Sequence, residues 1–346
     1  MGAIVLCYHS INYGQRIDPE TFEENLFVLK KHGYTPVKLS DVYNYVIGKL
    51  KLPKKAVAIT FDDGYADNLI YAYPLLKKYE FFATIFVIVS KITSNIRRID
   101  FDGLKSLNMV NSVNDFIEKS HYLSFEELKY LEDSKLVDIQ SHSLNHKACF
   151  CSNKVFKFND SRFGEWLFEY TNDKRLGIPV YEKKWDCACE CIKDDLKLRD
   201  YMHEFVSKHN GIMFFKKRNA QKILYRQYKK YIKKHSLDLY IEPRYERIKR
   251  LETEVFESKR ILEEKLNKNV DFFCYPFGSY DDVSKEYVKR AYKAAFTLKI
   301  GQNMLNDDVY ELKRIEVRSG NWLEKRLKIY KSPLLSKIYA SIYRKI

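Results

Sequence analysis

Residues 56–64 read AVAITFDDG, and this stretch decides the fold class of the chain. Its first six residues are apolar or β-branched throughout, which is typical of a strand covered on both faces. Such strands occur mainly in parallel sheets that have helices on both sides. The two carboxylates that follow stand at the carboxyl end of this strand, where parallel α/β folds gather their functional side chains.

Apolar runs of strand length recur along the rest of the chain, at residues 4–8, 36–39, 81–89, 137–140, 272–275, 294–300 and 312–317. Segments with helical periodicity lie between most of them, at residues 19–31, 40–47, 68–79, 124–131, 251–266 and 282–291. Strands that alternate with helices indicate a parallel sheet with right-handed crossovers. We therefore predict a (β/α) barrel, complete or slightly open, with seven to eight parallel strands.

Residues 151–240 interrupt this alternation and predict an insertion that is mainly helical. The stretch from residue 214 to residue 235 carries nine Lys and Arg residues, several aromatic residues and no acid. A solvated helix face and a contact surface for a polyanionic ligand both fit this basic aromatic pattern. The expected division is a barrel at 1–150 and 241–322, the insertion at 151–240, and a C-terminal tail at 323–346.

The tail combines positive charge with an apolar stripe. Residues 321–346 contain seven Lys and Arg residues and one acid. A helix over this segment would carry one apolar stripe, formed by Leu334, Leu335, Ile338, Tyr339, Ile342, Tyr343 and Ile346. Such a stripe fits either a helix docked on the barrel or a helix that lies in the surface of an anionic membrane.

Composition excludes several classes of protein. The chain has 346 residues, 31% of them charged and 45% hydrophobic, with 12 Gly and 8 Pro, so it is neither disordered, nor collagen-like, nor a small disulfide scaffold. Its 61 basic and 46 acidic residues give a net charge of +15, which predicts an anionic partner. The N-terminus, MGAIVLCYHSI, lacks the pattern of a signal peptide, and no apolar run reaches about 20 residues. We therefore expect a cytoplasmic protein that could be peripheral on the cytoplasmic face of a membrane.

The seven cysteines are expected to be free thiols, because their number is odd and the expected compartment is reducing. Cys187, Cys189 and Cys191 alternate, so a strand would place them on one side. Cys149 and Cys151 lie close after His146 in the sequence. A second metal or redox cluster is the alternative, but none of these spacings is the one common in zinc sites.

Three predicted strand ends carry residues suited to catalysis. Asp62 and Asp63 form an adjacent carboxylate pair, which either a divalent metal or an Asp-Gly turn with Asp62 as a helix cap would explain. His142 and His146 follow another strand and, with one carboxylate, would make a three-ligand site of the catalytic type. His9 follows the first strand and could act as an acid or be a hydrogen-bonded core residue. Together these residues point to metal-assisted hydrolysis.

Four motifs carry a resemblance to a known family: TFDDG at 60–64, HSLNH at 142–146, YPFG at 275–278 and YHS at 8–10. They resemble the polysaccharide deacetylase (NodB-like) family of metal-dependent carbohydrate esterases. The resemblance covers residues 1–150 and roughly 245–322. It implies a metal-dependent hydrolase that removes acetyl groups from sugars.

The resemblance also implies roles for single residues. Asp62 would be the general base, and Asp63, His142 and His146 would hold a divalent metal, with Zn²⁺ the default choice. The family's usual late catalytic His is missing, so the chain is similar to the permuted-motif variant in which an N-terminal His, here His9, is the acid.

Two further roles involve the YPFG motif at 275–278 and the residue before it. The backbone amide of Phe277 would be the oxyanion donor. Cys274 stands where the family has the Arg that orients the base, and Arg314 is a candidate substitute because a guanidinium can hold a carboxylate through two hydrogen bonds.

The leading functional hypothesis is removal of N-acetyl groups from an amino sugar in a surface polysaccharide or lipopolysaccharide precursor that is nucleotide- or lipid-linked. One alternative is an O-deacetylase on the same scaffold. Another is a catalytically inactive protein that binds a polyanion such as nucleic acid. The intact Asp and His pairs argue against the inactive protein, and we do not expect nucleic acid as a partner. The expected partners are an N-acetylated sugar and, through the tail, an anionic membrane.

Overall fold

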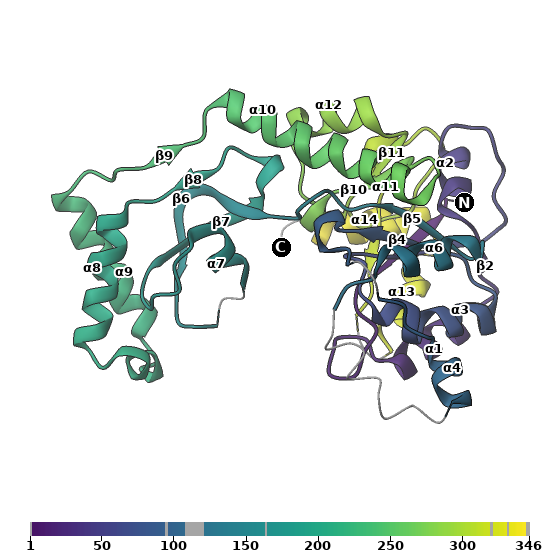
Figure 1. Cartoon of the computed structure of the whole chain (residues 1–346), viewed down its shortest axis with the longest axis horizontal. Helices are drawn as coiled ribbons and strands as arrows, with labels where there is room; N and C mark the ends of the chain where they lie inside the picture. The colour runs from purple at the N-terminus through teal and green to yellow at the C-terminus, as the bar shows by residue number, and fades with distance from the viewer. Residues whose placement is uncertain are drawn as a thin grey trace. The chain divides into compact units, whose positions relative to one another are not determined.

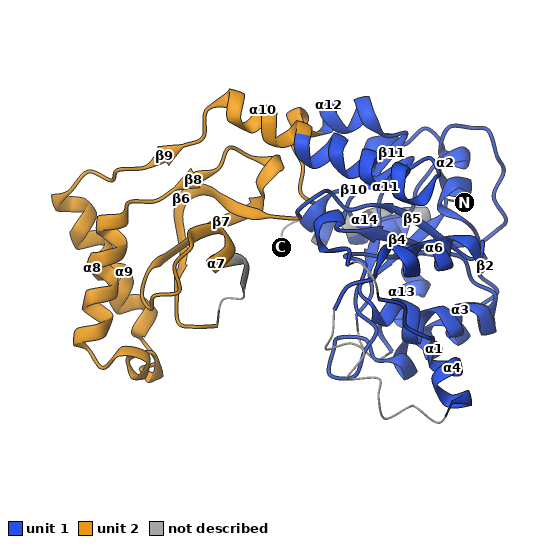
Figure 2. Cartoon of the chain, viewed as in Figure 1, with its two compact units in different colours: residues 1–145, 253–278, 285–346 blue, residues 146–252, 279–284 orange. Residues whose placement is uncertain are grey.

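The computed structural model describes residues 2–93, 96–107, 121–162, 165–318, 321–330 and 332–343 (Figure 1). The chain divides into two compact units (Figure 2). Unit 1 comprises residues 1–145, 253–278 and 285–346, and unit 2 comprises residues 146–252 and 279–284. The segment expected as a separate tail, 323–346, thus falls within unit 1. The assignment of a catalytic and an inserted domain stays a prediction.

A single parallel sheet forms the centre of unit 1. Its strands follow the order β11-β10-β5-β4-β3-β1-β12, and β2 pairs with the first residues of β3. Every pairing between these strands is parallel. Their bounds are β1 Ile4–Tyr8, β2 Thr35–Pro36, β3 Ala56–Phe61, β4 Ala83–Val87, β5 Val137–Ser141, β10 Phe272–Cys274, β11 Ala294–Phe296 and β12 Ile315–Glu316.

The two ends of this sheet meet along a short seam. Leu312, just before β12, donates its backbone N–H to Ala295 of β11 (3.0 Å), and its carbonyl accepts from Thr297 (2.8 Å). Because β12 pairs with β1 at the far end of the strand order, these bonds curl the sheet toward closure. The predicted (β/α) barrel is confirmed.

Helices alternate with these strands and lie around the sheet in Figure 1. Asp18 starts the first of them by accepting a hydrogen bond from the backbone of Thr21 at 2.7 Å. Ser124 and Glu127 form a reciprocal capping box at the start of α6. The bounds are α1 Pro19–Lys31, α2 Leu39–Val46, α3 Tyr73–Tyr79, α4 Phe101–Ser106, α6 Phe125–Asp133, α11 Ser258–Leu266, α12 Asp282–Ala291, α13 Trp322–Tyr330 and α14 Pro333–Tyr343.

Unit 2 contains the predicted helices and also strands that the sequence analysis did not predict. An antiparallel pair, β6 (Ala148–Phe158) and β7 (Pro179–Trp185), forms most of its sheet structure. A shorter pair joins β8 (Ile192–Lys193) to β9 (Tyr240–Ile241). The helices are α7 Glu165–Thr171, α8 Leu196–Lys208, α9 Ala220–Lys234 and α10 Arg244–Glu252.

The basic aromatic stretch of unit 2 forms α9. Its apolar side buries Leu224, Tyr228 and Tyr231 in a cluster with residues of α8. The basic residues of this helix are exposed, namely Lys222, Arg226, Lys229, Lys230, Lys233 and Lys234. This arrangement is that of an amphipathic helix with a solvated basic face.

Residues 186–188 form a 3₁₀ turn, so Cys187 and Cys189 do not share a strand. Cys187 is buried, whereas Cys189 and Cys191 are half-buried. The alternating spacing of the three cysteines therefore does not place their sulfurs on one side of a strand.

The C-terminal helix α14 packs on α13 with only part of its apolar surface. The ring of Tyr339 contacts the ring of Tyr330 in α13. Four aliphatic side chains of α14 are exposed, at 47–67%: Leu334, Leu335, Ile338 and Ile342. The side chain of Tyr343 and residues 344–346 lie outside the described residues. Among the described helices, none combines the length and apolar character required to cross a membrane.

Candidate active site

The site begins at the end of β3, where the ladder to β1 continues for one more residue. The backbone N–H of Asp62 donates to the carbonyl of Tyr8 at 2.9 Å. Asp63 and Gly64 then turn the chain, and both have a left-handed backbone conformation, with φ of 72° and 78°. Asp62 itself caps no helix: its side chain is buried and binds Arg314.

Arg314 holds the Asp62 carboxylate through two parallel hydrogen bonds. Its Nη1 donates to Oδ1 at 2.6 Å and its Nη2 donates to Oδ2 at 2.8 Å. The guanidinium is fully buried and donates further to Thr60 and to the carbonyl of Thr297. Burial by itself raises the pKa of the Asp62 carboxyl, but the Arg314 guanidinium holds it well below its usual range. Asp62 is therefore a carboxylate with a fixed orientation.

Two buried thiols complete the surroundings of Asp62. Cys7 of β1 lies 3.5 Å from Oδ2, and Cys274 of β10 lies 3.6 Å from the same oxygen. Burial raises the pKa of both thiols well above the usual value, so each is a neutral donor to the carboxylate. Cys274 also accepts a hydrogen bond from Arg314 at 2.8 Å. The position of the family's motif Arg thus holds a thiol, and the guanidinium beside Asp62 comes from the segment before β12.

Asp63, His142 and His146 bring one ligand atom each into a group whose members lie within 4.8 Å of one another. His146 directly follows Asn145 at the point where the residue range of unit 2 begins. Two imidazoles and a carboxylate are a donor set that suits Zn²⁺ and other first-row divalent metals. The residues present therefore fit a catalytic divalent metal, whose identity stays a prediction.

His142 is oriented for such a role. Its Nδ1 lies 2.9 Å from the carbonyl oxygen of Cys274, which can only accept, so Nδ1 carries the proton. The lone pair of Nε2 is then left on the side of Asp63, 3.6 Å from its Oδ1. Histidine ligands of metals are commonly fixed in this way by a hydrogen bond at the other ring nitrogen.

Four residues of this region have a left-handed backbone although they are not glycine: Asp63, Ser143, His146 and Phe277, at φ 72°, 69°, 55° and 56°. This conformation is costly for side chains with a Cβ, and such residues cluster at functional sites. Phe277 follows β10 in the YPFG motif. Its proposed role as the oxyanion donor through the backbone amide stays a prediction.

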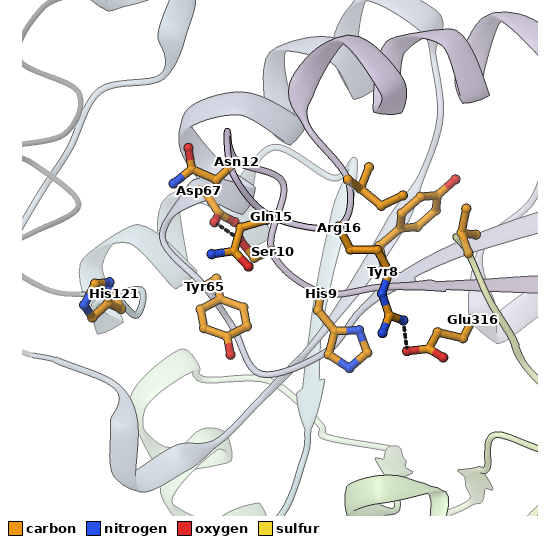
Figure 3. Close-up of a pocket in the computed structure, with 12 residues that line it drawn as sticks. Tyr8, His9, Ser10, Asn12, Gln15, Arg16, Tyr65, Asp67, His121 and Glu316 are labelled. Carbon is orange, nitrogen blue, oxygen red and sulfur yellow. Dashed lines mark hydrogen bonds and ion pairs between the residues drawn. The ribbon is translucent and has the colours of Figure 1, made fainter. Parts of the chain in front are cut away.

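His9 follows β1 and connects the carboxylate to a pocket. A ring nitrogen of His9, the Cys7 sulfur and an Asp62 oxygen lie within 4.8 Å of one another. The pocket has a volume of about 360 Å³, within the range typical of small-molecule sites. Figure 3 shows His9 between Tyr65 and Glu316, which also line this pocket. Glu316 pairs with Arg16 at 2.6 Å.

The polar wall of this pocket is not predicted by the sequence. Asp67 accepts hydrogen bonds from the Ser10 hydroxyl (2.5 Å) and from the backbone of Ile11 (3.1 Å). Burial raises the pKa of Asp67 to about 6. His121 also lines the pocket. The only available signal for Asp67 was its place a few residues after TFDDG, and His121 had none.

Comparison with known proteins finds a family match for part of the chain. Residues 49–166 match the sequence model of the family described as polysaccharide deacetylase. The chain is 33% identical over 144 residues to YxkH of Bacillus subtilis (strain 168), an alignment that covers 41% of this chain and 42% of that protein. It is 32% identical over 124 residues to the poly-beta-1,6-N-acetyl-D-glucosamine N-deacetylase of Staphylococcus aureus (strain MSSA476), covering 35% and 42%.

A solved structure of similar fold is that of IcaB from Ammonifex degensii, with a TM-score of 0.55 and 18% identity over 95% of this chain and 97% of the other. The chain spans about two fifths of the length of the curated relatives named above (42% in each case). The family match and these relatives agree with the motifs on the strand ends. Residues 49–166 are thus similar to the polysaccharide deacetylase (NodB-like) family, and the solved structure shares the fold of the chain.

Proposed function

We propose that this protein hydrolyses the N-acetyl groups of amino sugars in a polysaccharide or its precursor and releases acetate. The observation that carries the proposal is the position of Asp62, a buried and oriented carboxylate 3.9 Å from Nε2 of His142. A base in a fixed orientation next to a metal-ligand set is what hydrolysis of an amide requires. The S. aureus relative, whose name gives poly-beta-1,6-N-acetyl-D-glucosamine as its substrate, supports an N-acetylated sugar.

Each residue has one task in this proposal. Asp63, His142 and His146 would hold the metal, which when bound acidifies water and polarises a carbonyl oxygen. Asp62 accepts the proton of the attacking water, and Arg314 keeps its carboxylate oriented. The backbone amide of Phe277 donates to the developing oxyanion. His9 gives a proton to the departing amine, because an amine leaves an amide readily only when it is protonated.

The direct test measures acetate release together with metal content. Purified protein is expected to contain about one divalent metal per chain and to release acetate from oligomers of N-acetylglucosamine, since three ligands favour one ion. Dialysis against a chelator should abolish activity, and re-addition of Zn²⁺ should restore it. Release of acetate from O-acetylated sugars alone would favour the O-deacetylase alternative. A protein that binds no metal and releases no acetate would contradict the proposal.

His9→Gln is expected to lower the rate of acetate release from an N-acetyl sugar by about a hundredfold or more, because proton transfer to the leaving amine is lost. Hydrolysis of an aryl acetate should change little, since a phenolate leaves without protonation. His32→Gln is the matched control, because His32 lies outside the pocket and pairs with Glu324 at the surface. If His9→Gln lowers the rate of hydrolysis equally for the N-acetyl sugar and the aryl acetate, His9 is not the acid.

A second part of the proposal concerns the group to which the substrate sugar is linked and the location of the enzyme in the cell. The net charge of +15 suits a substrate linked to a nucleotide or lipid diphosphate. The four exposed aliphatic side chains of α14 and the net charge of +6 over residues 321–346 suit an anionic membrane surface. We therefore include in the proposal a peripheral location on the cytoplasmic face of a membrane.

The double variant Leu335→Glu/Ile338→Glu is expected to lose sedimentation with vesicles that contain phosphatidylglycerol, because it places two carboxylates on the exposed apolar face of α14. Deletion of residues 334–346 should have the same effect. Leu196→Glu, which changes an exposed leucine of α8, is the control and should sediment as the unmodified protein does. Unchanged sedimentation of both tail variants would refute membrane binding through this helix.

A further inference from the structure

Unit 2 contains a cluster of three thiols with no role in the proposed hydrolysis. Cys149 of β6 is buried, and its sulfur lies 3.5 Å from the sulfur of Cys189. The thiol of Cys149 is also within hydrogen-bonding reach of Cys191. All three cysteines are free in this structure.

The surroundings of these thiols differ in charge and access. The hydrogen bond with Cys149 lowers the pKa of Cys189, and the cations Arg250 and Lys184 act in the same direction. Cys189 is half-buried, so a small reagent can reach it. A thiol with a lowered pKa, near cations and partly exposed, is the reactive type of cysteine.

The backbone permits a bond between the two closest sulfurs. Cys149 is held in the β6–β7 ladder opposite Lys184. Cys189 ends the 3₁₀ turn that follows β7 and has an extended backbone, with no ladder partner until β8. A disulfide requires sulfurs about 2.05 Å apart, so the two must approach by about 1.5 Å. The segment that carries Cys189 can supply this movement, since it lies between regular elements.

The geometry points to a reversible disulfide between Cys149 and Cys189. In the first step the Cys189 thiolate attacks a small-molecule disulfide of the glutathione type, forms a mixed disulfide and releases one thiolate. In the second step Cys149 loses its proton and attacks the sulfur of Cys189, which releases the second small thiol. Two protein thiols are oxidised, one external disulfide is reduced to two thiols, and the proton from Cys149 passes to the thiolate that leaves.

The disulfide would lie beside a second cavity, which is lined by residues of unit 2. This cavity of about 290 Å³ is lined by Ala148, next to Cys149, and by Cys191 and Arg250. A crosslink between Cys149 and Cys189 would join the two segments that contribute Ala148 and Cys191 to its wall. The oxidised form is therefore expected to resist proteolysis in the segment between residues 185 and 193.

The test equilibrates the reduced full-length protein with mixtures of reduced and oxidised glutathione and maps its peptides without reduction. Oxidising mixtures should yield two fewer free thiols than the seven of the reduced chain and a single crosslinked pair that contains Cys149 and Cys189. Dithiothreitol should restore all seven. Cys189→Ser should abolish the crosslink. Cys151→Ser is the matched control and should retain it, because that sulfur bonds the carbonyl of Glu182 instead.

Several results would overturn the assignment. The proposal fails if the thiols stay reduced in every mixture or if Cys189 forms a glutathione adduct without a crosslink. It also fails if the crosslink joins two chains. Loss of the crosslink in Cys191→Ser would assign the bond to Cys191 instead. Zinc that co-purifies with the Asp63→Asn/His146→Gln variant and protects these thiols from alkylation would show a metal cluster. Circular dichroism of each variant checks that loss of the crosslink is not loss of the fold.

Discussion

Asp62→Asn is expected to lower the rate of acetate release by about a thousandfold, because the amide cannot accept the proton of the attacking water. The side chain keeps its size and can still accept one hydrogen bond from Arg314, so the variant should remain folded. Asp63, His142 and His146 are untouched in this variant. Its metal content should therefore equal that of the unmodified protein, and KM should change much less than kcat.

Asp133→Asn provides the control for this experiment, since Asp133 is an exposed carboxylate on α6 that pairs with Lys129 at 3.6 Å. It should leave both activity and metal content unchanged. Full activity in Asp62→Asn would remove Asp62 from the reaction. Loss of metal in the same variant would instead make Asp62 a ligand, which would exchange the roles proposed for the two adjacent carboxylates.

Arg314→Met is expected to lower the free energy of unfolding by about 3–5 kcal/mol, because it leaves the Asp62 carboxylate buried without its cation. Adding Asp62→Asn to this variant should recover a large part of the loss, since no charge then remains to be buried. Arg260→Met is the control: Arg260 is half exposed on α11 and pairs with Glu257 and Glu264 at the surface, so its change should be below about 0.5 kcal/mol.

The pH dependence of stability should change in sign with the same substitution. With Arg314 present, the lowered pKa of Asp62 gives stability that is present above the ordinary value of 3.8 and is lost only as pH falls through the folded value. In Arg314→Met, burial should raise that pKa instead, so stability should fall as pH rises from about 4 to 7. Asp67, with its raised pKa, contributes equally to both proteins and cancels in the difference.

Urea unfolding of both proteins at several pH values between 4 and 7 measures this difference. A variant whose stability shows the same pH dependence as the unmodified protein would mean that another group neutralises Asp62. A double variant no more stable than Arg314→Met would mean that the loss comes from packing around the guanidinium rather than from the unpaired charge.

The barrel and its strand ends could be predicted because they depend on local pattern. The run before Asp62 is apolar without alternation, and β3 occupies the expected residues 56–61. Residues that follow parallel strands share one edge of the sheet, so Asp62, His142 and His9 could be expected together without knowledge of the strand order.

Contacts between residues far apart in the chain are harder to predict, because they depend on the strand order. Arg314 and Asp62 are 252 positions apart, and only the strand order places β12 next to β1, whose other neighbour is β3. The β6–β7 pair was missed because about 20 residues, including α7, separate its strands, and periodicity does not identify a pairing partner. The short distance between Cys149 and Cys189 depends on that same pair.

The partners that orient Asp62 lie in strands of the barrel or directly beside them. Cys7 lies in β1, Cys274 ends β10, and Arg314 stands at the seam before β12. Loops that connect strands can therefore lengthen or diverge without disturbing Asp62. In evolutionary terms, segments inserted between the strands can vary among relatives while the groups around Asp62 stay the same.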